Sequence, residues 1–119
     1  NDYYPEFAIT GMTVLPSYVE QNPETIQKVV NALQKAITYI RQHPNEVADF
    51  HITKFPDEPK DIAESAVQNM ITAGVFPSDT VITKAGWEAA IQARLDVGDL
   101  KSAAPYENYV IINFSERAK

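Results

Sequence analysis

Cysteine is absent from the 119-residue sequence, and this absence excludes several kinds of site at once. Without cysteine there is no disulfide framework, no thiolate zinc site, no iron–sulfur cluster and no cysteine nucleophile. Basic residues are also fewer than acidic ones: the sequence has ten Lys and Arg and sixteen Asp and Glu, which gives a net charge of −6. Proteins that bind nucleic acid or anionic lipid through phosphates need the opposite balance. We therefore expect no nucleic-acid partner.

Long apolar runs are missing as well, and the longest is far too short to span a bilayer. We therefore expect no direct insertion into a membrane. The first residues, Asn1–Pro5, have neither an initiator Met nor a leader, so they read like the interior of a longer protein. A chain of this length removes roughly two-thirds of its extended surface from water, which is enough for one core. We expect residues 1–119 to form a single domain or a fragment of one.

Recognised catalytic and metal-binding frames are also missing. His43 and His51 are eight residues apart, and no carboxylate lies four residues from either one to complete a metal-binding helix face. The acidic residues at 57–64 lack the turn glycine of a calcium loop. There is no glycine-rich phosphate cradle and no Gly-x-Ser-x-Gly frame. We expect no catalytic residue, no metal and no cofactor, and hence a protein that is not an enzyme.

One segment has the composition of a β-strand. Phe7–Leu15 mixes apolar and β-branched residues between two prolines, and Gly11 at its centre suggests a bulge or a close backbone approach. A lone strand cannot satisfy its own backbone groups, so it must join a sheet. That sheet would come from missing sequence, from another copy by self-association, or from the tail at 106–114. The apolar content of the tail leaves open whether it is a strand or a docked irregular segment.

Four helices are predicted by caps, stops and apolar spacing. The first runs from Pro23 to about His43 after the Asn22 cap, and the short stretch at 16–21 before it is a turn or a helical piece. The second follows Pro44, the third begins after Pro59 and ends at Gly74, and the fourth runs from the Thr83 cap to Gly98. Their expected inward residues are Val47, Phe50 and either His51 or Phe55 in the second, Ile62, Ala66, Met70 and Ile71 in the third, and Trp87 in the fourth. The predicted fold class is α+β and helix-dominated, with about four helices and one or two strands.

The candidate ligand-binding residues surround the predicted strand. Thr10, Gly11 and Met12 can present a hydroxyl and backbone amides to a small anion, although a buried strand with an odd glycine explains them equally well. Tyrosines before the strand and in the tail can line a cleft, the alternative being packing plus one hydrogen bond. The set of ligand-binding candidates is Tyr4, Thr10, Gly11 and Met12.

The order of several motifs resembles a known family. Asn22-Pro23-Glu24 opening a long helix, the His43–Glu46 break and the later Gly86-Trp87 helix ending at Gly98 follow one another as in substrate-binding proteins of nitrate, sulfonate and taurine ABC importers, which share a fold with thiamine-pyrimidine synthase-like proteins. The chain resembles their C-terminal part. Each motif alone is an ordinary helix cap or helix terminator, so the resemblance rests on the order and spacing of the motifs.

This resemblance implies part of one lobe of a bilobed type 2 periplasmic binding fold. It further implies a solute-binding component that captures a small molecule such as a sulfonate, nitrate, taurine or a thiamine-pyrimidine precursor and delivers it to a membrane permease without chemistry. The expected location is then periplasmic or extracellular, a lipoprotein included. Two alternatives stay open: a pyrimidine-precursor enzyme of the same superfamily, and a small helical interaction module that only mimics the pattern.

Overall fold

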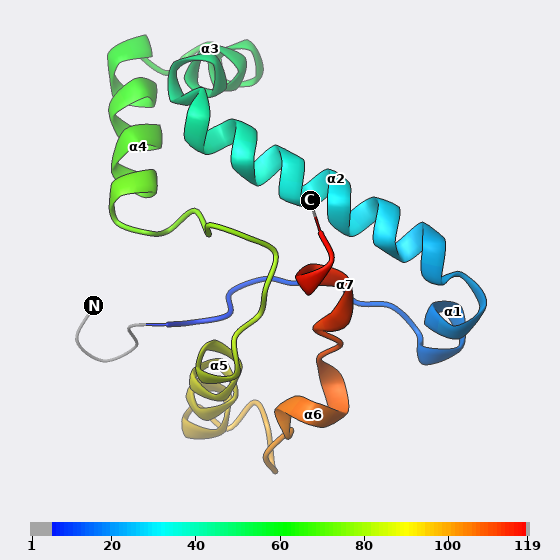
Figure 1. The fold of residues 1–119 in the computed structure, drawn as a ribbon. Coiled ribbons are helices and arrows are strands. Elements are labelled where there is room, and N and C mark those ends of the chain that lie inside the picture. Colours follow the sequence, from blue (N-terminus) through cyan, green and yellow to red (C-terminus); the bar gives the residue numbers. More distant parts are fainter. Residues whose placement is uncertain (1–5, 119) are drawn as a thin grey trace. The chain divides into compact units, whose positions relative to one another are not determined.

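Helices alone make up the regular secondary structure of the part of the chain that the structure, a computed structural model, describes, residues 6–118 (Figure 1). The seven helices are α1 (Pro16–Gln21), α2 (Pro23–Gln42), α3 (Pro44–Lys54), α4 (Lys60–Thr72), α5 (Lys84–Asp96), α6 (Tyr106–Tyr109) and α7 (Asn113–Glu116). The predicted α+β class with one or two strands is wrong, because no strand occurs within these residues.

The predicted strand is a segment without regular secondary structure. Phe7–Leu15 runs as the blue trace of Figure 1, and Leu15 keeps β-region dihedral angles (φ −70°, ψ 141°). A strand requires a ladder of hydrogen bonds to a neighbour, and none of the described residues supplies one. The tail does not supply it either, because its backbone forms the short helices α6 and α7.

The helix boundaries are those that the caps and prolines predict. Pro23 and Pro44 each open a helix, and their fixed φ suits a first helical residue that has no intrahelical bond to donate. Thr83 caps α5, since its hydroxyl oxygen accepts from the amide of Gly86 at 3.0 Å. Gly74 and Gly98 have φ of 70° and 80°, the left-handed conformation that ends a helix. All four predicted helices are therefore confirmed, and 16–21 is helical too.

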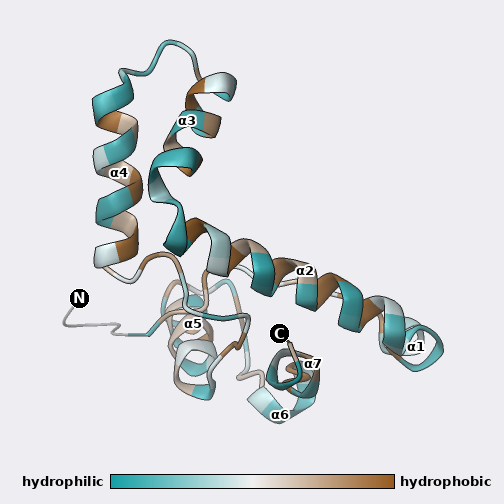
Figure 2. Ribbon diagram, turned by 45° about the horizontal axis from the view of Figure 1, so that its top comes forward, coloured by the Kyte–Doolittle hydropathy of each residue, from teal (hydrophilic) through white to brown (hydrophobic). Residues whose placement is uncertain are grey.

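The described residues divide into two compact units. One consists of 6–27 with 81–117, and the other of 28–80 with 118. In the second unit α3 and α4 form a helical hairpin, whose closed core consists of Ala48, Ala63 and Val67. Partly buried apolar side chains surround this core: Val47, Ile52 and Ile71. In Figure 2 the apolar residues of α4 lie along the edge that faces α3.

The inward faces of α3 and α4 differ from the predicted ones. Phe50 is 63% exposed and Ile62 57% exposed, and Ala66 and Met70 are exposed as well, whereas Val47 and Ile71 do contact the core. Small side chains let two helices approach closely, so Ala48 and Ala63 are buried while larger side chains lie outside. The prediction was therefore right for Val47 and Ile71 and wrong for the exposed residues Phe50, Ile62, Ala66 and Met70.

In the first unit, aromatic and amide side chains donate hydrogen bonds to backbone carbonyls. The indole of Trp87 donates to the Ala104 carbonyl at 2.6 Å, and the Tyr106 hydroxyl donates to the Ile82 carbonyl at 2.7 Å. Gln27 donates to the carbonyl of the buried Phe114 at 2.9 Å. These bonds attach the α5–α7 region to its neighbours without a continuous helix–helix interface. Trp87 is half-buried rather than fully enclosed.

Candidate functional site

The extended segment, defined here as Phe7–Leu15, is fixed at its start to the first turn of α5. The Ala8 amide donates to the Gly86 carbonyl at 3.0 Å, and the Thr83 hydroxyl donates to the carboxylate of Glu6. The same Thr83 oxygen accepts from the Gly86 amide, so one threonine caps the helix and holds the approach to the segment. These hydrogen bonds therefore fix the start of the segment against the first turn of α5.

Two glycines allow this close approach. A Cβ on Gly86 would lie 3.0 Å from the Thr83 hydroxyl oxygen and 3.5 Å from the Ala8 amide nitrogen. A Cβ on Gly11 would lie 3.0 Å from the Ile82 side chain. Gly11 thus marks a close contact with the loop before α5, one of the two predicted explanations for a glycine in this segment.

Three of the four predicted ligand-binding residues are consecutive and exposed. Thr10, Gly11 and Met12 lie on the extended segment beside the loop before α5, and within residues 6–118 their amides, carbonyls and the Thr10 hydroxyl form no hydrogen bond. Such groups are free to bind a ligand, and they are equally free to pair with another strand. Tyr4 lies outside the described residues. The assignment of these four residues as ligand-binding therefore stays a prediction.

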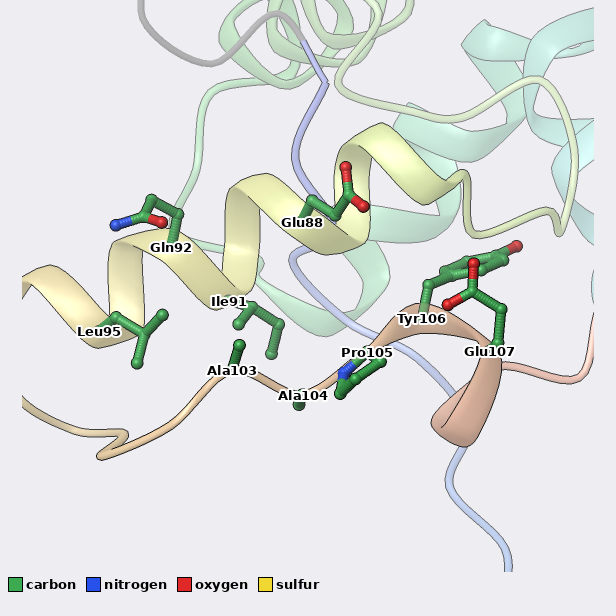
Figure 3. Close-up of a pocket in the computed structure, with 9 residues that line it drawn as sticks. All are labelled: Glu88, Ile91, Gln92, Leu95, Ala103, Ala104, Pro105, Tyr106 and Glu107. Atoms are coloured by element: carbon green, nitrogen blue, oxygen red, sulfur yellow. The ribbon is translucent and has the colours of Figure 1, made fainter.

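A shallow cavity of about 340 Å³ lies between α5 and the chain that leads into α6 (Figure 3). Its floor is apolar, and Ile91 lies close to Ala103 and Ala104, while the carboxylate of Glu88 and the amide of Gln92 point away from this strip. A cleft that holds a small polar solute needs several polar groups converging on it. This cavity lacks that convergence and is a packing gap between a helix and a loop.

The charged groups beside that cavity form ion pairs with one another. Lys84 lies 2.6 Å from a carboxylate oxygen of Glu107 and 4.0 Å from one of Glu88. The hydrogen bond to Glu107 raises the pKa of Lys84, and the hydrogen bond from Lys84 lowers the pKa of Glu107. Both shifts favour the charged forms that already predominate at neutral pH, so neither group is prepared for proton transfer there.

A second hollow, of about 430 Å³, lies at the junction of α2 and α3. It is lined by Tyr39, Ile40, Glu46, Val47 and Phe50. The Tyr39 hydroxyl donates to the Glu46 carboxylate, and this hydrogen bond raises the pKa of the tyrosine. His43 stacks on Tyr39 with ring centroids 4.4 Å apart and lies 3.1 Å from Glu46. The polar groups are satisfied within the hollow, and its remaining surface is apolar.

The two histidines are surface groups paired with one carboxylate each. His51 lies 2.8 Å from Glu58 and stacks on Phe55, and His43 pairs with Glu46. Among residues 6–118 no three metal-ligating side chains come together. In the same part of the chain no helix has the length and apolar content needed to cross a membrane.

Comparison with known proteins identifies a family for the region that contains the extended segment. Residues 1–47, from the first residue through α2, match the profile of the family described as "NMT1/THI5 like". These residues are thus similar to that family, over less than half of the chain. The chain is also 24% identical over 114 residues to the protein named "Putative binding protein YtlA" from Bacillus subtilis (strain 168). The two matches confirm the resemblance to a substrate-binding protein that the motif order predicted.

The match to the Bacillus subtilis protein covers very different shares of the two proteins. It covers 94% of this chain and 34% of the length of the relative, so the chain spans about a third of that protein. It therefore extends well beyond the residues 1–47 that match the family. No solved structure matches the chain significantly.

Sequence analysis missed the loop on which the candidate segment rests. Ile82 contacts Gly11, Thr83 binds Glu6, and Tyr106 binds the Ile82 carbonyl. The cap at Thr83 was visible in the sequence, but its contact with a residue 77 positions away was not. Tyr106 donates one hydrogen bond to the backbone, which agrees with the alternative that the tail tyrosines pack rather than bind a ligand. Tyr109 stacks on Trp87 with ring centroids 5.9 Å apart.

Proposed function

We propose that this chain is part of the solute-binding component of an ABC importer and acts without catalysis. The observation that carries the proposal is the exposed, unpaired run Thr10–Met12 on an anchored segment, within the residues that match the NMT1/THI5-like family. The name of the Bacillus subtilis relative supports a binding role in the same direction. The full protein would then deliver its solute to a membrane permease from a periplasmic or extracellular position.

The chemistry of the three residues favours a small anionic or strongly polar solute. Backbone amides and a threonine hydroxyl donate hydrogen bonds, and donors that converge on one point select oxygen-rich groups. Sulfonates, nitrate, taurine and thiamine-pyrimidine precursors all present such acceptors. Capture proceeds by a shift toward a closed form, which requires the solute to bind the closed form more tightly than the open one.

A thermal-shift screen of these four solute classes tests the proposal on the full-length protein. A solute at about 100 times its Kd stabilises the native protein by about 2.7 kcal/mol, which raises the melting temperature by several degrees. Thr10→Val keeps the shape of the side chain and removes its hydroxyl. Because a hydrogen bond to a charged group contributes about 1.5–3 kcal/mol, the variant should bind at least about tenfold more weakly.

The matched control is Thr13→Val, the same replacement three positions along on an exposed residue outside the candidate set. It should bind the solute as the unmodified protein does. The proposal is wrong if no solute of the four classes stabilises the full-length protein. The role of Thr10 is wrong if both valine variants bind equally well.

A further inference from the structure

The hollow at the junction of α2 and α3, termed the α2–α3 hollow, plays no part in the proposed function. Its lining residues are Tyr39, Ile40, Glu46, Val47 and Phe50, and all of them belong to one compact unit. Its volume of about 430 Å³ lies within the range of small-molecule pockets, which is roughly 300–1,000 Å³. A protein partner usually contacts about 20–30 residues, so a hollow with five lining residues suits a small molecule better.

Apolar side chains form most of the wall of the α2–α3 hollow. Ile40 and Val47 are half-buried, and Phe50 is 63% exposed. Phe50 also lies outside the core of the α3–α4 hairpin, so its ring is not needed to close that core. An exposed aromatic ring beside two aliphatic side chains can cover the apolar part of a ligand.

Glu46 is the charged residue among the five, and its carboxylate has room for a further partner. One oxygen accepts from the Tyr39 hydroxyl, and the other lies 3.1 Å from Nδ1 of His43. A carboxylate has about four acceptor positions, so these two contacts leave about two for a ligand. The Glu46 side chain is 62% exposed, which lets a donor reach it.

The two neighbours of Glu46 leave its negative charge in place at mildly alkaline pH. The hydrogen bond to Glu46 raises the pKa of Tyr39 and so keeps the phenol in its neutral form. His43 adds a positive charge only when it is protonated, and imidazoles are ordinarily neutral at pH 8. A hollow with one carboxylate and otherwise uncharged walls favours a cationic ligand.

The ring of Phe50 already attracts a cation that belongs to the chain itself. Nζ of Lys54 lies 5.4 Å from the centre of this ring. Ammonium groups at such distances are held by the negative face of an aromatic ring. The aromatic wall and the carboxylate therefore favour the same ligand charge.

We propose that the α2–α3 hollow is a second ligand site, which binds a small organic ammonium ion with an apolar body. The ammonium group donates to the carboxylate of Glu46, and the apolar body lies against Ile40, Val47 and Phe50. The site goes beyond the proposed function, because it uses other residues and takes a ligand of the opposite charge from an anionic solute.

Calorimetric titration of the full-length protein at pH 8 tests the charge of the ligand. The probes are 2-phenylethylammonium, its neutral analogue 2-phenylethanol and its anionic analogue phenylacetate. The ammonium ion should bind at least about tenfold more tightly than either analogue, because only it forms a charge-assisted hydrogen bond to the carboxylate. Equal affinity for the alcohol, tighter binding of phenylacetate or no saturable binding of the ammonium ion overturns the proposal.

Glu46→Gln tests the carboxylate, since it keeps the shape of the side chain and removes the charge. The ammonium ion should bind at least about tenfold more weakly to this variant. Glu58→Gln is the matched control, because Glu58 is also an exposed carboxylate paired with a histidine, at 2.8 Å from His51, and lies outside the hollow. It should bind the ammonium ion as the unmodified protein does. Equal affinities of the two glutamine variants overturn the proposal.

Phe50→Leu tests the aromatic wall independently of the carboxylate. It keeps an apolar side chain but removes the ring, so the ammonium ion should bind about two- to fivefold more weakly. Phe55→Leu is the matched control, because Phe55 is 54% exposed at the end of α3 and does not line the hollow. It should leave the affinity unchanged. Equal affinities of the two leucine variants would place the ligand away from Phe50 and contradict the proposal.

Thr10→Val separates this site from the proposed solute site. It removes a hydroxyl on the extended segment, which does not line the hollow, and should leave the affinity for 2-phenylethylammonium unchanged. An equal loss of affinity in Thr10→Val and Glu46→Gln would overturn the proposal of a second site.

Discussion

The α3–α4 hairpin and the extended segment differ in what they need from the rest of a protein. Each helix of the hairpin satisfies its backbone internally, and the pair closes its own core around Ala48, Ala63 and Val67. The extended segment is richer in apolar residues, yet Ile9–Val14 makes no backbone hydrogen bond within residues 6–118. The difference follows from backbone bonding, since a helix pairs with itself and a strand pairs with a neighbour.

This comparison explains why the described residues contain helices and no strand. Local sequence sufficed for the four predicted helices, and all four are present in the structure. The predicted α+β class was wrong because a sheet depends on residues far along the polypeptide, and within residues 6–118 no backbone group pairs with Ile9–Val14.

The largest effect on stability is expected from a larger side chain in the core of the α3–α4 hairpin. Ala63 is 2% exposed at the α3–α4 contact, so Ala63→Leu must separate the helices or strain their side chains. We expect the free energy of unfolding to fall by about 1–3 kcal/mol. Urea unfolding of the 119-residue chain followed by circular dichroism measures it.

Ala66→Leu is the matched control, because Ala66 lies on the same helix with its side chain exposed. It should change the free energy of unfolding by less than about 0.5 kcal/mol. Equal losses for the two variants would mean that the hairpin core is not centred on Ala63.

A smaller effect is expected where the extended segment meets α5. Thr83→Val removes the cap on the Gly86 amide and the hydroxyl that binds Glu6. Loss of such a cap reduces the free energy of unfolding by about 1 kcal/mol, and exchange of the Ala8 amide should become faster. Thr83→Ser keeps the hydroxyl and should restore both readouts. A valine variant that behaves like the serine variant would contradict the role given to the hydroxyl.

The smallest expected effect concerns the Lys84–Glu107 pair on the surface of the same unit. Hydrogen bonding to Lys84 lowers the pKa of Glu107 below its usual 4.5. A depressed carboxyl pKa stabilises the folded protein above the unfolded value and loses that contribution as the pH falls through the folded value. The window therefore lies at and below pH 4.5.

An NMR titration of the Glu107 side chain measures this shift. The midpoint should lie below 4.5 in the unmodified chain and return toward 4.5 in Lys84→Met, which removes the donor. Lys101→Met removes an exposed charge that is not among the groups that shift the pKa of Glu107, and it should leave the midpoint in place. An unchanged midpoint in Lys84→Met would show that the ion pair does not persist in solution.

The sequence alone was sufficient where a signal is local. Prolines at 23 and 44, the Thr83 cap and the two left-handed glycines at 74 and 98 gave each helix its ends, because each acts within one turn. The inward faces of α3 and α4 could not be obtained in the same way. Which side of a helix is buried depends on how closely its partner approaches, and there the alanines were favoured over Phe50 and Ile62.

The candidate site was predictable only in part for a similar reason. The composition of Phe7–Leu15 pointed to Thr10–Met12, and the structure brings these residues next to the loop before α5. The contact of Gly11 with Ile82 and that of Glu6 with Thr83 each join positions more than seventy apart. A single sequence has no pattern that reports such a pairing.

The most direct test of the central claim is hydrogen exchange of the full-length protein with and without a solute that stabilises it in the thermal screen. The account predicts that the solute slows exchange of the amides of residues 10–12, while the α3–α4 hairpin exchanges at the same rate in both samples. Unchanged exchange at residues 10–12, with slowing confined to other parts of the protein, would contradict it.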